Sequence, residues 1–288
     1  MAKDTAQAHI SNEIFHAGRR MTGAPNQAAR KKAVEDLVSI ANGTAGHKPT
    51  KDHIVEIGNV LIRTLNASAN DPAAAEDVAF GLYKIATGEG DMVNEQHRRI
   101  AVASMVVAMK DVRTHQDPKL VHPKVKIANM LMNMNDSNKP GTELGDRQKA
   151  TVASALLSSA NVQRKAGKDN SSLTKCALSV MKNAKADIAV PEWRDALIST
   201  LSMVMPEIDL STNTAGPLPE VPEDTLLVLE AFGSNAVNMQ EDLQGVIGTL
   251  NDDCYEQKDL VLENADEVTR VRVSAALTNL YTCEMAIA

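Results

Sequence analysis

Residues 50–88 read TKDHIVEIGNVLIRTLNASANDPAAAEDVAFGLYKIATG. The first half of this stretch carries an apolar stripe at the spacing i, i+3, i+7 and i+11: Ile54, Ile57, Leu61 and Leu65. Residues at this spacing lie on one face of a helix. Asp71 and Pro72 then supply a helix N-cap followed by proline at the first helical position. The stretch therefore predicts two amphipathic helices joined by a short turn.

The same start, stop and periodicity signals recur along the chain at intervals of about 24 residues. They predict about twelve helices, which start near Asp4, Gln27, Thr50, Asp71, Asn94, His122, Asp146, Ser171, Pro191, Glu223, Asn238 and Ala265. Only seven of the 288 residues are aromatic, whereas β-sheets favour aromatic and β-branched residues. The apolar content of 43% is close to that of ordinary globular proteins. We therefore expect an all-α protein with antiparallel helices.

A helix pair recurs about every 47 residues, which is the repeat length of HEAT and armadillo solenoids. An arginine is followed three residues later by alanine at four places: Arg30/Ala33, Arg98/Ala101, Arg147/Ala150 and Arg272/Ala275. Residues 266–277, DEVTRVRVSAAL, resemble the second helix of a HEAT repeat. At the level of this class, the chain resembles a HEAT/armadillo-like helical repeat, which implies an α-solenoid. A compact irregular helical bundle is the alternative, because amphipathic helices with short loops also build that fold.

Charge and proline content suggest three regions. Residues 1–185 hold 26 basic and 18 acidic residues, a net charge of +8, whereas residues 186–288 hold 4 basic and 19 acidic residues, a net charge of −15. The stretch 206–222 contains four prolines: Pro206, Pro217, Pro219 and Pro222. We expect a net basic helical-repeat region over 1–205, a Pro-rich loop or linker over 206–222, and acidic C-terminal helices over 223–288 that pack on the same solenoid. Asp136–Glu143 is a second irregular stretch and a further candidate boundary.

The sequence shows no sign of a membrane span or a secretory signal. The longest mainly apolar run, Ile100–Met109, is half the roughly 20 residues that a spanning helix needs. The three cysteines contain no C-x-x-C pair, which argues against a disulfide framework or a structural zinc site. We expect a cytoplasmic protein, with signal-independent export or a place in a virion as the alternatives.

Few residues suggest chemistry at a site. His9, Glu13 and His16 stand at i, i+4 and i+7 of the first expected helix, and are weak candidates for a divalent metal. A solvated polar stripe is the alternative explanation for this spacing. The chain has no phosphate-binding glycine motif, nucleophile elbow or zinc-protease motif. We therefore predict no catalytic residue and no cofactor, and expect a protein that is not an enzyme.

An acidic cluster near the C-terminus suggests a binding surface. It consists of Asp252, Asp253, Glu256, Asp259 and Glu263. Their spacing does not match a calcium-binding loop, so a solvated face or a docking surface for a basic protein partner explains them better. Basic clusters in the first half lack interleaved aromatics, which makes nucleic acid an unlikely ligand.

These features favour a non-enzymatic scaffold or adaptor that binds another protein through a helical-repeat surface. The unequal charge of the two parts also suits head-to-tail self-association, so a self-assembling structural protein of a shell, virion or filament is the alternative. An all-helical enzyme is a second alternative, because catalytic groups from distant residues can converge in space.

Overall fold

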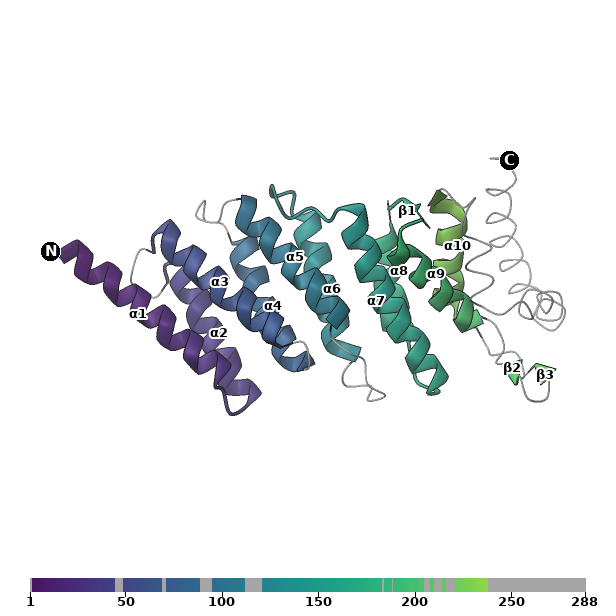
Figure 1. Cartoon of the computed structure of the whole chain (residues 1–288), viewed down its shortest axis with the longest axis horizontal. Helices are drawn as coiled ribbons and strands as arrows, with labels where there is room; N and C mark the ends of the chain where they lie inside the picture. The colour runs from purple at the N-terminus through teal and green to yellow at the C-terminus, as the bar shows by residue number, and fades with distance from the viewer. Residues whose placement is uncertain are drawn as a thin grey trace. The chain divides into compact units, whose positions relative to one another are not determined.

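A computed structural model describes residues 2–44, 49–68, 71–88, 95–111, 121–182, 184–187, 189–204, 208–209, 214–215 and 221–237 (Figure 1). Over these ranges the chain forms ten helices and two pairs of two-residue strands. The all-α prediction is therefore confirmed. None of the helices in these ranges is both long enough and apolar enough to cross a membrane. The chain divides into two compact units, Met1–Leu144 and Gly145–Ala288.

Six helices form the first unit: α1 (Ala2–Thr22), α2 (Gln27–Ala41), α3 (Lys51–Ala67), α4 (Pro72–Thr87), α5 (Glu95–Asp111) and α6 (Val121–Asp136). Three of them start at a residue whose side chain caps the helix. Asn26 accepts from the backbone N–H of Ala29, and Asp71 accepts from that of Ala74. At the start of α3, Thr50 and His53 form a reciprocal capping box.

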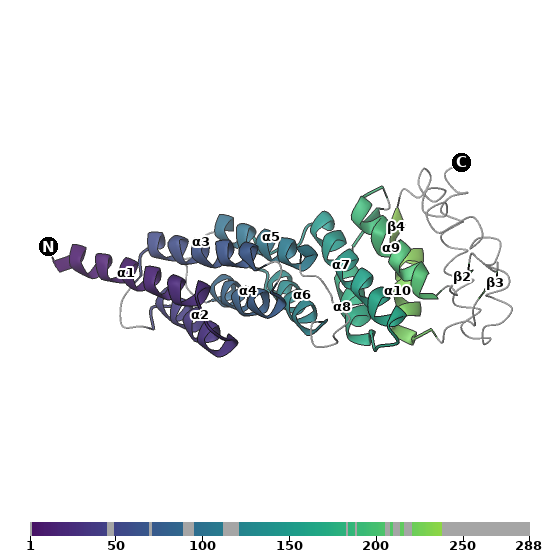
Figure 2. The ribbon, with the colours of Figure 1, turned by 60° about the horizontal axis from the view of Figure 1, so that its bottom comes forward.

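The first unit has two layers of helices. The helices α1, α3 and α5 follow one another in one layer, and α2, α4 and α6 follow one another in the second (Figure 2). Each consecutive pair, α1/α2, α3/α4 and α5/α6, also packs across the layers. The apolar stripe of α3 is buried between them, as its spacing predicts: Ile54, Ile57, Leu61 and Leu65 are each at most 4% exposed.

The close contact of α4 with its neighbours depends on Gly81. A Cβ at this position would lie 2.7 Å from Val34 Cγ1 of α2 and 3.3 Å from Leu61 Cδ2 of α3. Three helices therefore meet at a point where no side chain fits without a shift.

The turn after α6 forms hydrogen bonds with the end of α4 and with the first turns of α5. Lys139 Nζ donates to the backbone oxygens of Thr87 and Gly88, at 2.6 and 2.7 Å, and so caps the end of α4. Arg98 of α5 donates through Nε to the Pro140 oxygen at 2.6 Å. Gly141 has a φ of +87°, which glycine adopts without a steric cost. The irregular stretch Asp136–Glu143 is thus a well-bonded turn, and the boundary between the two units follows it directly.

The second unit contains α7 (Asp146–Lys165), α8 (Ser171–Met181), α9 (Pro191–Val204) and α10 (Glu223–Asn235). Both α7 and α10 pack against α8 and α9. Trp193 of α9 meets Phe232 of α10 edge-on, with ring centroids 6.1 Å apart, a favoured geometry for buried rings. Strand β1 (Ala186–Asp187) pairs in parallel with β4 (Ala236–Val237).

Ten helices are described where the sequence predicts about twelve. All ten begin within a few residues of an expected start, and the two remaining starts, near Asn238 and Ala265, lie outside the described residues. Within the stretch 206–222, β2 (Ile208–Asp209) and β3 (Thr214–Ala215) form an antiparallel pair. The division into regions 1–205, 206–222 and 223–288 stays a prediction.

Candidate functional site: a groove over α2, α4 and α6

A cavity of about 370 Å³ opens over the second helix layer of the first unit. We call it the α2–α4–α6 groove. Its lining comes from three helices that are consecutive in that layer: Lys31, Val34 and Glu35 of α2, Glu76, Asp77 and Phe80 of α4, and Lys126 and Met130 of α6. The lining combines apolar side chains with charges of both signs.

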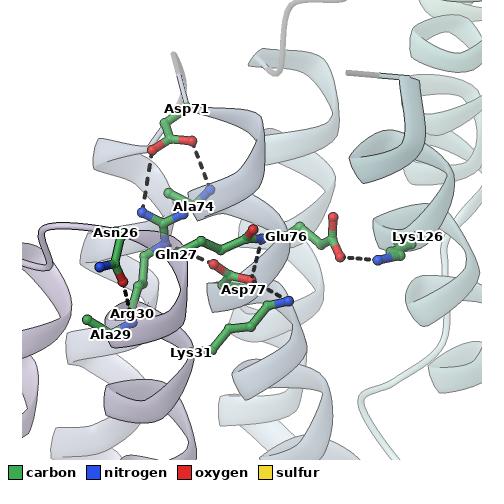
Figure 3. Close-up of polar contacts among 10 residues, drawn as sticks. All are labelled: Asn26, Gln27, Ala29, Arg30, Lys31, Asp71, Ala74, Glu76, Asp77 and Lys126. Carbon is green, nitrogen blue, oxygen red and sulfur yellow. Dashed lines mark hydrogen bonds and ion pairs between the residues drawn. The ribbon is translucent and has the colours of Figure 1, made fainter. Parts of the chain in front are cut away.

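The wall between α2 and α4 contains a buried ion pair (Figure 3). Arg30 Nε donates to Asp77 Oδ2 at 2.9 Å, and Gln27 donates to Asp77 Oδ1 at 3.4 Å. Arg30 also lies 3.6 Å from Asp71, at the start of α4. One arginine of α2 thus contacts two carboxylates of α4, which fixes the spacing of the two helices.

Burial dominates the electrostatics of Asp77. Its side chain is 1% exposed, and this desolvation raises the pKa of the carboxyl above its ordinary value. The hydrogen bonds from Arg30 and Gln27, with the nearby charges of Arg30 and Lys31, lower the pKa and offset part of that effect. The ion pair therefore positions the helices at an electrostatic cost.

A second ion pair connects α4 with α6. Lys126 Nζ lies 2.5 Å from Glu76 Oε1 (Figure 3). The Glu76 side chain is 12% exposed and that of Lys126 is 43% exposed. The carboxylate therefore lies in the wall, while the ammonium group reaches the solvent.

Apolar side chains also line the groove. Phe80 is 41% exposed, and the Lys84 ammonium group lies 5.3 Å from its ring centroid. Val34 is buried beside it, and Met130 is half-buried on α6. Both α4 carboxylates of the lining are engaged by cations, so the groove offers apolar contact, ammonium groups and the exposed carboxylate of Glu35.

The three methionines of α6 are distributed over different environments. Met134 is buried in the core, while Met130 and Met132 are half-buried. Alternate residues of a helix do not share one face, and Met130 is the one that faces the groove.

The metal candidates lie together on α1, away from this groove. His9, Glu13 and His16 line an open groove of about 800 Å³ between α1 and α2, together with Arg19, Arg20 and Asp36. His9 Nε2 is 3.8 Å from Glu13 Oε1. In the part of the chain that the structure describes, no three His, Cys, Asp or Glu residues are placed to hold a metal ion. The metal assignment stays a prediction with no geometric support.

The five acidic residues predicted to bind a basic partner, Asp252, Asp253, Glu256, Asp259 and Glu263, lie outside the described residues. Their role as a docking surface stays a prediction. Cys176, on α8, is described and buried, and burial raises the pKa of its thiol to about 11. A thiol in that state is protonated at neutral pH and unreactive.

Sequence reasoning missed the charged residues of the α2–α4–α6 groove. One signal was available: Asp77 stands at i+3 from Ala74 and at i−4 from Gly81, within the buried stripe of α4. A carboxylate at a buried helix position needs a partner. The partner itself, Arg30, is 47 residues away, and the sequence alone does not identify it.

The comparisons with known proteins do not assign the chain to a family. No protein-family model matches the chain, and no curated protein matches it. Among solved structures, the chain is similar to the crystal structure of an engineered protein, with 15% identity over 93% of this chain and 68% of that one, and a TM-score of 0.27. A likeness this low carries no information about function.

Proposed function

We propose that this protein is a non-enzymatic scaffold or adaptor, built from HEAT/armadillo-like helix pairs, that binds another protein through the α2–α4–α6 groove. The observation that carries the proposal is the exposed Phe80 beside Met130 in a groove whose walls are fixed by two interhelical ion pairs. Aromatic residues and methionines are enriched where proteins bind one another.

The groove is preorganised for binding. Arg30 holds α2 against α4, and Lys126 holds α6 against α4. A partner therefore meets a surface whose helices need no ordering, which lowers the entropic cost of association. A cavity of about 370 Å³ suits one or two anchor side chains of a peptide segment, the usual form of a binding hot spot.

A peptide selection tests the proposal. Random peptides displayed on phage are selected against the full chain, and the enriched peptides are then synthesised and titrated by fluorescence anisotropy. Phe80→Ala is expected to weaken binding at least tenfold, because removing a central aromatic anchor costs about 2 kcal/mol or more.

Phe15→Ala is the matched control. Phe15 of α1 is 54% exposed and also carries a cation one turn later, with Arg19 5.8 Å from its ring centroid, but it lies outside the groove lining. Binding should survive this change. If no enriched peptide distinguishes Phe80→Ala from Phe15→Ala, the groove is not the binding surface and the proposal fails.

Self-assembly is a second candidate function, which the unequal charge of the sequence favours. Residues 1–185 carry a net charge of +8 and residues 186–288 a net charge of −15, and complementary charges promote head-to-tail association at low salt. Sedimentation velocity at low and high salt tests it. Oligomers that dissociate as salt increases would support self-assembly, and a monomer at every salt concentration would remove it.

A further inference from the structure

The charged side chains of the α2–α4–α6 groove differ in how deeply they are buried. The two α4 carboxylates are in the walls, with exposed side-chain fractions of 1% for Asp77 and 12% for Glu76. Their lysine neighbours are at the rim, with fractions of 53% for Lys31 and 43% for Lys126. An incoming ligand therefore meets these two ammonium groups before it meets the two α4 carboxylates.

From this difference in burial we infer that the groove binds a peptide segment in which an acidic side chain adjoins an apolar one. The inference rests on the proposed function and specifies the chemistry of the partner. The apolar side chain packs on Phe80 and Met130, and the acidic side chain pairs with the lysines at the rim. Charge complementarity of this kind sets specificity and association rate.

Lys31 is the better placed of the two rim lysines. Its Nζ lies 3.9 Å from Asp77 Oδ1, beyond hydrogen-bond distance. The other oxygen of Asp77 already accepts from Arg30 at 2.9 Å. Lys31 therefore has its ammonium donors available for a carboxylate that approaches from the solvent.

Lys126 can bind a second acceptor while it keeps its partner. An ammonium group has three donors, and the Glu76 contact at 2.5 Å uses one of them. Glu76 also holds the lysine head in place, so a ligand carboxylate does not have to immobilise a free side chain.

Two further charges adjust the balance at the rim. Glu35 of α2 is exposed and lines the groove, and it opposes an acidic ligand on that side. Lys84 is exposed over the Phe80 ring and adds a third ammonium group to those of Lys31 and Lys126. The exposed charged groups near Phe80 are thus the ammonium groups of three lysines and the carboxylate of one glutamate, which favours an acidic ligand over a basic one.

The test uses the phage selection on the full chain and reads the charge of the enriched peptides. Peptides that need Phe80 are expected to combine Asp or Glu with an adjacent Leu, Ile, Phe or Met. The double variant Lys31→Gln with Lys126→Gln should then bind these peptides about tenfold more weakly at low salt, and the difference should shrink as salt increases.

Lys32→Gln with Lys51→Gln is the matched control. It removes the same total charge from two exposed lysines that do not line the groove, and should leave the affinity within about twofold of the original, since exposed charges outside an interface contribute little. Neutral glutamine avoids placing a new carboxylate beside Glu76 or Asp77. Circular dichroism melts of both double variants check that each is folded.

The possible outcomes separate the inference from the proposed function. Acidic, apolar peptides that lose affinity in the groove variant and keep it in the control support both. Peptides that need Phe80 but are basic or neutral would overturn the inference that the ligand is acidic. The same holds for peptides that bind the groove variant as tightly as the original chain. Neither outcome contradicts the proposed scaffold function. A selection without any peptide that needs Phe80 overturns both.

Discussion

Lys124 is a buried cation in the first unit, near the start of α6. It is 5% exposed, and burial lowers the pKa of its ammonium group from 10.5 to about 8. The N-terminal end of a helix dipole also disfavours a positive charge. In the unfolded chain the same lysine keeps its proton up to a higher pH. The folded protein is therefore less stable below pH 8, and gains stability as pH rises from about 8 to about 10.5.

We predict that Lys124→Met abolishes this gain, so that the free energy of unfolding no longer rises with pH between about 8 and about 10.5. Urea unfolding at pH 7 and pH 10 measures the effect. Lys32→Met, at an exposed position of α2, serves as the control and should keep the pH dependence of the original chain. Identical pH dependence in Lys124→Met and the original would contradict the assignment.

At the scale of the helices, Gly81 sets how closely α4 approaches α2 and α3. Gly81→Ala is expected to destabilise the protein by up to about 2 kcal/mol, because overpacking costs about 1–3 kcal/mol and the higher helix propensity of alanine offsets about 1 kcal/mol of that cost. Gly58→Ala, on α3, is the matched control, since a Cβ there meets nothing within 4 Å. It should be neutral or stabilising. Thermal melts measure both variants. If Gly81→Ala and Gly58→Ala shift the melting temperature in the same direction, the close packing at Gly81 is contradicted.

The Arg30–Asp77 pair connects α2 and α4 across the groove. Arg30→Met or Asp77→Leu alone leaves a buried charge without its main partner, and each should cost about 3 kcal/mol. The double variant should cost no more than either single one, because an apolar pair escapes the desolvation that raises the pKa of Asp77. Urea unfolding of the original chain, the two single variants and the double variant measures the interaction free energy between the two side chains. Additive losses would show that the two side chains act independently.

The helices could be predicted from the sequence because their signals are local. Asp71 before Pro72, and the stripe from Ile54 to Leu65, each lie within one or two helical turns. The groove depends on contacts between distant residues, with Arg30 and Asp77 47 positions apart and Glu76 and Lys126 50 apart. Local signals do not identify which charges of distant helices pair, so the partner of each charge required the structure.

At the level of the whole chain, we propose that the first unit binds the partner. Its second helix layer carries the groove that is lined by the exposed Phe80 and by the Lys31–Asp77 and Lys126–Glu76 ion pairs. In the described part of the second unit, the large aromatic pair, Trp193 and Phe232, is buried in the core. A ligand that binds through an apolar anchor should therefore perturb the first unit and leave the core of the second unchanged.

Methyl NMR of the full chain with ¹³C-labelled methionine tests this claim most directly. Met130 lines the groove, and Met203 is buried in α9 of the second unit, so the two methyl groups report on the site and on the core of the second unit. We assign their signals with Met130→Leu and Met203→Leu, and titrate a peptide from the selection. We expect the chemical shift of the Met130 methyl group to change in proportion to binding, and that of the Met203 methyl group to stay unchanged. Saturated binding with an unchanged Met130 signal would contradict it.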